Sequence, residues 1–253
     1  MMRRALVAIS SFAIVLGAAP PALATGEKPS GEITVFAAAS LTESFNAIAK
    51  QFEKRYPDVS VRFNFDSSSN LAAQIQQGAP ADAFASADEA SIEKVTESGD
   101  VTLTPVVFAK NRLEIAVEKG NPKKVRGLAD LDESGLVVVL CTDAVPCGKY
   151  AAEAFANAGV TVSPASKEEN AKATLSKVSL GEADAGVVYV TDVKATKGEV
   201  SGVKIPDRQN VIAAYPIATV KGSENSTAAK AWVQFVRSKT AQSTLRRFGF
   251  LPP

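Results

Sequence analysis

The stretch from Ile33 to Phe45 constrains the fold most, because it has the pattern of a buried strand that runs directly into a helix. Residues 33–36 are apolar and β-prone, and residues 37–39 are alanines, small enough to let another group approach the backbone. Ser40 then stands where a helix N-cap is expected, with Glu43 three residues later as in a capping box. A helix start with free N–H groups and a hydroxyl suits a small tetrahedral dianion. Taken alone, however, this stretch favours a serine that only caps its helix.

Three more places repeat the order of strand, polar loop and helix. An alternating strand over 59–65 leads through three serines at 67–69 into a helix over 71–77, which stops at Gly78. A valine-rich strand over 136–140 leads through residues 141–148 into a helix over 149–158. Ser166 to Glu169 reads as another capping box and opens a helix that runs to Leu180. With the first junction, this makes four helix starts that can donate backbone N–H groups.

The remaining pattern also alternates between strands and helices, which is typical of an α/β protein with mostly parallel sheets flanked by helices. A short strand that ends in a polar turn is expected over 80–88, and further strands at 106–109, 113–117, 160–162, 187–190, 203–205 and 212–220. Further helices are expected at 91–97 and 226–238, with a last short helix that ends at 248–250. Leu128 to Leu131 is expected to form a short helical turn.

The chain is predicted to cross between two lobes twice, near Lys110 and near Tyr215, so that one lobe is inserted in the other. Lobe 1 then comprises residues 32–109 and 216–253, and lobe 2 residues 110–215. Ligands of such sheets bind at the carboxyl ends of the strands, which here face the cleft between the lobes.

The N-terminus has the pattern of an export signal. Arg3 and Arg4 precede an apolar run over 5–19, and Ala22-Leu23-Ala24 fits a small-x-small cleavage site. We therefore expect a signal peptide over 1–24 and a flexible leader over 25–31. No cysteine lies at the cleavage point, so no lipid anchor is expected there. The protein is predicted to be secreted across the cytoplasmic membrane, into the periplasm or the space at the cell surface.

Charge and residue content exclude several classes of function. The net charge of the 253 residues is +1, which gives no general basic field for nucleic acid or for an anionic membrane. Histidine is absent, which rules out a Ser-His-Asp or Cys-His catalytic site and leaves two cysteines as a poor zinc site. In an exported protein those cysteines, Cys141 and Cys147, favour a disulfide, and the alternative is a pair of free buried thiols.

Six segments taken together resemble the periplasmic molybdate-binding proteins of ABC importers, and the match runs through the mature chain in order. The segments are Phe36–Thr42, Phe65–Leu71, Gly78–Asp82, Val145–Ala151, Gly186–Tyr189 and Arg247–Phe250. The resemblance implies the two-lobed type II periplasmic-binding-protein fold, with a cleft between the lobes. It also implies a monomer that captures molybdate, usually with tungstate, and delivers the anion to the membrane subunits of an ABC permease. Neither catalysis nor a cofactor is implied, and the only metal is that of the bound oxyanion.

The family holds its anion with hydroxyls and backbone N–H groups rather than with charged side chains. Carried over by motif, the ligand-binding residues are Ser40, Ser68, Cys147, Ala171 and Tyr189. Cys147 stands where the family usually has alanine, and Ala171 where it usually has valine. Both contacts are made by the main chain, so neither change removes a donor.

Three rival interpretations remain open. The nearest is a receptor for sulfate or another tetrahedral oxyanion, since pocket dimensions decide between sulfate and molybdate. An enzyme built on the same fold is disfavoured by the missing histidine, metal cluster and nucleotide loop. A protein-interaction module would bind no small ligand at all.

Overall fold

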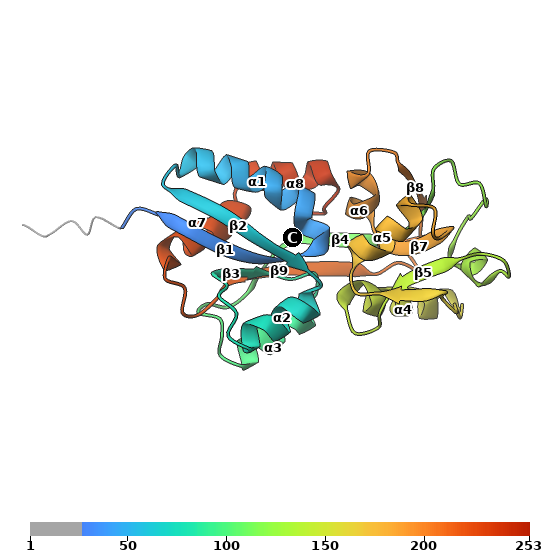
Figure 1. The fold of residues 1–253 in the computed structure, drawn as a ribbon, viewed down its shortest axis with the longest axis horizontal. Helices are drawn as coiled ribbons and strands as arrows, with labels where there is room; N and C mark the ends of the chain where they lie inside the picture. The colour runs from blue at the N-terminus through green and yellow to red at the C-terminus, as the bar shows by residue number, and fades with distance from the viewer. Residues whose placement is uncertain (1–26) are drawn as a thin grey trace, which may run out of the picture.

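The computed structural model describes residues 27–253, which form one mixed sheet of nine strands with helices on both faces (Figure 1). The expected signal peptide over 1–24 lies outside the described residues, and Gly31, which we placed in the leader, is the first residue of β1. The strands are β1 (Gly31–Ala38), β2 (Val59–Asp66), β3 (Ala83–Ala85), β4 (Val106–Glu118), β5 (Val138–Cys141), β6 (Ser166–Glu168), β7 (Ala185–Tyr189), β8 (Val200–Lys204) and β9 (Ile212–Thr219). The α-helices are α1 (Thr42–Arg55), α2 (Ser68–Gln76), α3 (Glu89–Glu97), α4 (Pro146–Ala158), α5 (Ala171–Ser179), α6 (Val190–Ala195), α7 (Ser226–Val236) and α8 (Lys239–Phe248). Two 3-10 turns, η1 (Ala39–Leu41) and η2 (Leu128–Asp132), complete the elements.

Strand order places the carboxyl ends of β1, β2, β5 and β7 near the middle of the molecule. The order is β2-β1-β3-β9-β4-β7-β5-β6, with β8 paired to β4. Strands β1, β2 and β3 pair in parallel, as do β5, β6 and β7, and every antiparallel pair involves β4 or β9. The parallel strands predicted from the sequence are therefore present, joined by two long antiparallel strands.

The two faces of the first group of strands are covered by different helices. On one face α1 and α7 pack around Trp232, whose ring meets Phe45 and Phe52 edge-on with centroids 5.5 and 5.3 Å apart. On the other face α2 and α3 contribute a second cluster that includes Leu71 and Ile92. Each helix buries the apolar face that its spacing predicts, and in Figure 1 α1 and α2 lie on opposite sides of the sheet.

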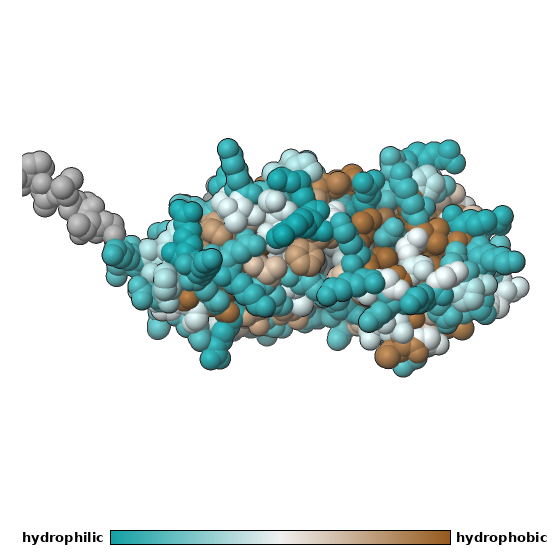
Figure 2. All heavy atoms as spheres, turned by 90° about the horizontal axis from the view of Figure 1, so that it is seen from above, coloured by the Kyte–Doolittle hydropathy of each residue, from teal (hydrophilic) through white to brown (hydrophobic). Residues whose placement is uncertain are grey.

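The second group of strands is covered in the same way, by α4 on one face and by α5 and α6 on the other (Figure 1). Ala154 of α4 belongs to the main core, whereas Leu175 of α5 and Val193 of α6 form a smaller cluster with Val139 and Val188. Figure 2 shows the molecule from above. Hydrophilic residues cover most of the surface seen there, and the hydrophobic residues between them lie mainly over the half of the molecule that carries α5 and α6.

Strands β4 and β9 link the two groups (Figure 1). The first half of β4, Val106 to Arg112, pairs with β9, and the second half pairs with β7 and β8. We expected two strands separated by residues 110–112, but β4 is continuous. Pro216, which has no N–H to donate, lies opposite Val107, beside a register shift in β4 that interrupts the ladder.

Three local features differ from the sequence prediction, one of them because of pairing with a distant strand. Residues 166–168 form β6, parallel to β5, and the helix starts only at Ala171, so the Ser166 capping box is absent. No strand forms at 160–162, and the helix α6 after β7 was not expected. Within 27–253, no helix is both long enough and apolar enough to cross a membrane.

Candidate functional site

All five residues predicted to bind a ligand line one pocket between the two groups of elements. Ser40, Ser68, Cys147, Ala171 and Tyr189 are each at most 4% exposed. The pocket has an internal volume of about 20 Å³, enough for a group at least the size of a water molecule. Its lining is completed by Ala38, Ala39, Asp66, Ser67, Ala87, Pro146 and Asn170.

Ser40 does not cap a helix, contrary to the sequence prediction. It lies inside the 3-10 turn η1, and α1 starts two residues later without a side-chain cap. The Ser40 hydroxyl instead forms a 2.8 Å hydrogen bond with the hydroxyl of Tyr215 on β9. Glu43 is engaged by a lysine rather than by the backbone of residue 40. The pocket wall at Ser40 is therefore fixed by a tertiary contact.

Ser68 is the first residue of α2, and its neighbour Ser67 is the N-cap. The Ser67 hydroxyl accepts from the N–H of Asn70 at 3.3 Å. The Ser68 oxygen accepts a hydrogen bond from the N–H of Ala87 at 2.9 Å. This bond uses an acceptor position of the hydroxyl, so its hydrogen stays available to a ligand in the pocket.

The start of α4 is held against the end of β5 by a disulfide. Cys141 and Cys147 are joined, as predicted, with their Cα atoms 5.8 Å apart. Pro146 occupies the first turn, where its missing N–H costs nothing. A Cβ on Gly148 would lie 1.9 Å from the Thr142 carbonyl oxygen, so only glycine allows this approach. Cys147 therefore presents the first turn of α4 at a fixed place in the pocket wall.

Ala171 opens α5, and the preceding Asn170 is its N-cap. The Asn170 side-chain oxygen accepts from the N–H of Ala173 at 2.9 Å. Ala171 and Cys147 both lie in first helical turns, whose N–H groups have no carbonyl partner within the helix. These N–H groups and the helix dipoles create a positive potential where the starts of α2, α4 and α5 converge.

Tyr189, at the end of β7, has a buried hydroxyl with no hydrogen-bond partner among the described residues. Burial is the main cause that raises the pKa of this phenol well above its usual value, so Tyr189 stays a neutral O–H donor. Its ring packs edge-on against Tyr215, with centroids 5.9 Å apart. An unpaired polar group in this position is costly unless a ligand completes it.

The pocket carries donors but no cationic side chain. No lysine or arginine lines it within 27–253. Asp66 lies in the lining, and its carboxylate already accepts from the N–H of Ser67 at 2.6 Å and from the amides of Asn70 and Asn170 at 3.1 and 3.3 Å. These three donors offset its negative charge and tie the start of α2 to the start of α5.

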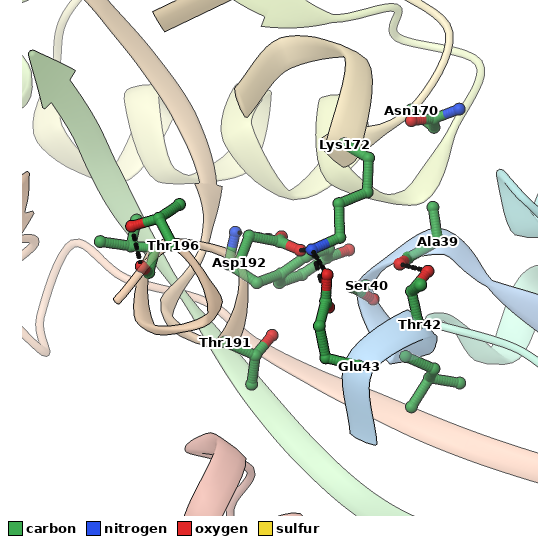
Figure 3. Close-up of polar contacts among 12 residues, drawn as sticks. Ala39, Ser40, Thr42, Glu43, Asn170, Lys172, Thr191, Asp192 and Thr196 are labelled. Carbon is green, nitrogen blue, oxygen red and sulfur yellow. Dashed lines mark hydrogen bonds and ion pairs between the residues drawn. The ribbon is translucent and has the colours of Figure 1, made fainter. Parts of the chain in front are cut away.

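A charged network flanks the pocket on the side of Tyr189. Lys172 contacts Glu43 of α1 at 2.8 Å and lies 3.6 Å from Asp192 of α6 (Figure 3). Asp192 also accepts from the Tyr189 N–H at 3.1 Å. Burial raises the pKa of Asp192 to about 6, although the Lys172 ammonium opposes the shift. Lys172 thereby joins α1 to α5 and α6, and Asp192 fixes the backbone of Tyr189.

Several residues that support the pocket were not predicted to be functional from the sequence. Tyr215, Asn111, Asp192 and Lys172 contact the predicted ligand residues or support them from behind. The sequence analysis placed Asn111 only between two expected strands, 106–109 and 113–117, near the predicted crossing at Lys110. A polar residue between two apolar runs was the available signal, since such a residue needs buried partners when its strand is buried.

Known proteins resemble this chain in sequence over most of its length. The family described as bacterial extracellular solute-binding protein matches residues 33–251. The molybdate-binding protein ModA of Mycobacterium tuberculosis (strain ATCC 25618 / H37Rv) is 40% identical over 221 residues, which cover 87% of this chain and 85% of the relative.

Two solved structures share the fold at lower identity. The periplasmic molybdate-binding protein of Azotobacter vinelandii has a TM-score of 0.75 at 20% identity, with 87% of this chain and 99% of that chain covered. The sulfate-binding protein SubI of Mycobacterium tuberculosis H37Rv has a TM-score of 0.76 at 22% identity, with 87% and 86% covered. At these identities the two structures establish the fold and leave the ligand open.

Proposed function

The chain belongs to the family of bacterial extracellular solute-binding proteins, and we propose that it captures molybdate, and also tungstate, and delivers the anion to an ABC permease. The ligand is held in the pocket between the two groups of elements by Ser40, Ser68 and Tyr189 through their hydroxyls and by Cys147 and Ala171 through their N–H groups. The single observation that carries the proposal is the convergence of these uncharged donors on one small pocket.

The physical chemistry of the pocket supports a fully deprotonated dianion. An anion stripped of water needs a hydrogen bond at each oxygen, and three hydroxyls with three helix starts supply such donors. The hydroxyl of Tyr189 has no partner among the described residues and can therefore donate to an anion oxygen. A proton-bearing anion would instead require a free acceptor from the protein. The one carboxylate in the lining, Asp66, already accepts from Ser67, Asn70 and Asn170, so such an anion fits the site poorly.

The proposal names molybdate rather than sulfate because of the relatives found by sequence. The 40% identical relative is a molybdate-binding protein. The resemblance to the sulfate-binding structure lies at 22% identity, where it supports only the fold. Sulfate or another tetrahedral oxyanion remains the alternative that the same donor chemistry allows.

The wider organisation follows from the same proposal. Residues 1–24 direct export and are removed, and the mature protein acts as a monomer outside the cytoplasmic membrane. Residues 32–109 with 216–253 and residues 110–215 form two lobes, which close on the anion by movement at β4 and β9. The protein carries out no catalysis, uses no cofactor and has no nucleic-acid partner. Its partners are the anion and the membrane subunits of the permease.

A calorimetric titration of the purified protein against molybdate, tungstate, sulfate and phosphate tests the proposed function. We expect tight, saturable binding of molybdate and tungstate with one site per chain, and weaker binding of sulfate. Tight sulfate binding without a molybdate response would replace the proposal by its alternative. The absence of any anion response would leave only the family membership.

A further inference from the structure

A chain of buried hydrogen bonds runs from the crossing strands to the pocket. The side-chain amide nitrogen of Asn111 on β4 lies 2.9 Å from the hydroxyl of Thr191 and 3.4 Å from that of Tyr215. The Tyr215 hydroxyl in turn lies 2.8 Å from the oxygen of Ser40. All four residues are buried, Asn111 and Tyr215 completely. Ser40 and Thr191 belong to the two different groups of elements, and Figure 3 shows them on separate ribbons.

The amide orientation of Asn111 sets the direction of this chain. Its side-chain oxygen accepts from the backbone N–H of Arg112 at 3.0 Å, so the nitrogen must face Tyr215 and Thr191. An amide nitrogen only donates. The Tyr215 oxygen therefore accepts from Asn111. Among the described residues, Ser40 is then the only partner of the Tyr215 hydroxyl that can accept its buried hydrogen, so Tyr215 is assigned as the donor to Ser40. Burial raises the pKa of the Tyr215 phenol, so this hydrogen stays in place at physiological pH.

The hydroxyl of Ser68 is also held with its hydrogen toward the pocket, through a different contact. There the backbone N–H of Ala87 donates to the serine oxygen at 2.9 Å. A backbone N–H has a fixed direction, so Ser68 is held as a donor toward the pocket. Both serines are thus oriented from behind, Ser68 by the backbone and Ser40 by side chains.

We propose that Asn111 and Tyr215, which do not line the pocket, are specificity-determining positioning residues that hold Ser40 as a hydrogen-bond donor to the bound anion. The inference rests on the proposed function and adds a mechanism of selection to it. Because the Ser40 oxygen accepts from Tyr215, its hydrogen faces the ligand. A pocket that presents hydrogens at both serines fits a bare dianion and opposes one that carries a proton.

The proposal is tested by a variant that reverses the direction of the hydrogen bonds between residue 111, Tyr215 and Ser40. In Asn111→Asp the new carboxylate accepts from Tyr215, Tyr215 then accepts from Ser40, and Ser40 turns its lone pairs toward the ligand. The two test anions are molybdate and, at pH 8, hydrogen phosphate. Both carry two negative charges, so the added carboxylate repels them alike, and the ratio of their dissociation constants reports hydrogen-bond polarity. We expect this ratio to shift toward hydrogen phosphate by at least about tenfold.

A second variant keeps the test decisive if the buried carboxylate prevents folding, which circular dichroism would reveal. Tyr215→Phe removes the donor behind Ser40, so the Ser40 hydroxyl is free to turn. We expect weaker molybdate binding and a smaller preference for molybdate over hydrogen phosphate. Asn210→Asp is the matched control, since Asn210 bonds the backbone of Leu113 beside the same crossing and has no bond to Tyr215. We expect it to leave the ratio unchanged.

The outcomes separate this inference from the proposed function. A parallel loss of both anions in Asn111→Asp, or an unchanged ratio in Tyr215→Phe, overturns the positioning role while the wild type still binds molybdate. A shift of the ratio in Asn210→Asp as large as that in Asn111→Asp also overturns it, because charge alone would then explain the effect. A wild-type protein that ignores molybdate refutes the proposed function instead.

Discussion

Replacing Tyr189 with phenylalanine is expected to weaken ligand binding and to stabilise the ligand-free protein. The Tyr189 side chain is buried, and its hydroxyl has no partner among residues 27–253. In the proposed complex this hydroxyl donates to an anion oxygen. Without the anion, the structure leaves the same group with no partner among residues 27–253.

The two effects have different sizes. A hydrogen bond to a charged group contributes about 1.5–3 kcal/mol, so its loss corresponds to roughly 10- to 150-fold weaker binding. An unpaired buried hydroxyl costs about 1–3 kcal/mol, and its removal leaves a small hole in the packing against Tyr215. We therefore expect the free energy of unfolding without ligand to rise by about 1 kcal/mol.

Calorimetry measures the affinity for molybdate, and urea unfolding without anion measures the stability. Tyr56→Phe is the control, because Tyr56 packs on Phe52 at the end of α1, away from the pocket lining. It should leave molybdate affinity as in the wild type. An unchanged affinity in Tyr189→Phe would refute the contact with the ligand. A ligand-free variant that is less stable than wild type would mean that the hydroxyl already has a partner.

Three further predictions follow from the site. Ser68→Asp should abolish anion binding, since it replaces a donor hydroxyl by a carboxylate that repels the anion; near-normal affinity by fluorescence titration would remove Ser68 from the site. Reducing the Cys141–Cys147 disulfide, which spans a sequence separation of 6, should lower the free energy of unfolding by about 2 kcal/mol. It should also weaken molybdate binding modestly, and an unchanged affinity would show that the disulfide has no role in shaping the pocket. The pKa of Asp192 is raised by burial from 3.8 to about 6, so its contribution to stability is full below pH 3.8 and is lost as the pH rises through 6. Asp192→Asn should therefore stabilise the protein at pH 8, by up to about 3 kcal/mol, with a gain that disappears near pH 4; a gain independent of pH in denaturant titrations would contradict this.

The elements that local chemistry specifies were predictable from the sequence. The strand that precedes Ser40, the serine-capped start of α2 and the start of α4 behind Pro146 appear close to where their patterns place them. The disulfide was expected from export and cysteine count, and it forms. The five predicted site residues, which the resemblance to the molybdate-binding family supplied, also line one pocket.

Other features depend on contacts between residues far apart in the chain. Ser40 has a good N-cap pattern, yet its hydroxyl bonds Tyr215, 175 residues later. Ser166 has the spacing of a capping box, but pairing with β5 draws it into a strand. Local pattern predicts what a segment prefers by itself, and a buried partner elsewhere can offer a better hydrogen bond. The relay from Asn111 to Ser40 is of this kind and becomes visible only in the folded chain.

The most direct test of the central claim is a crystal structure of the protein grown with molybdate, with the metal located by its anomalous scattering. We predict one strong peak in the pocket, with the anion oxygens within hydrogen-bonding distance of the hydroxyls of Ser40, Ser68 and Tyr189. A peak elsewhere on the protein, with the pocket left to water or filled by the Asp66 carboxylate, would contradict the account.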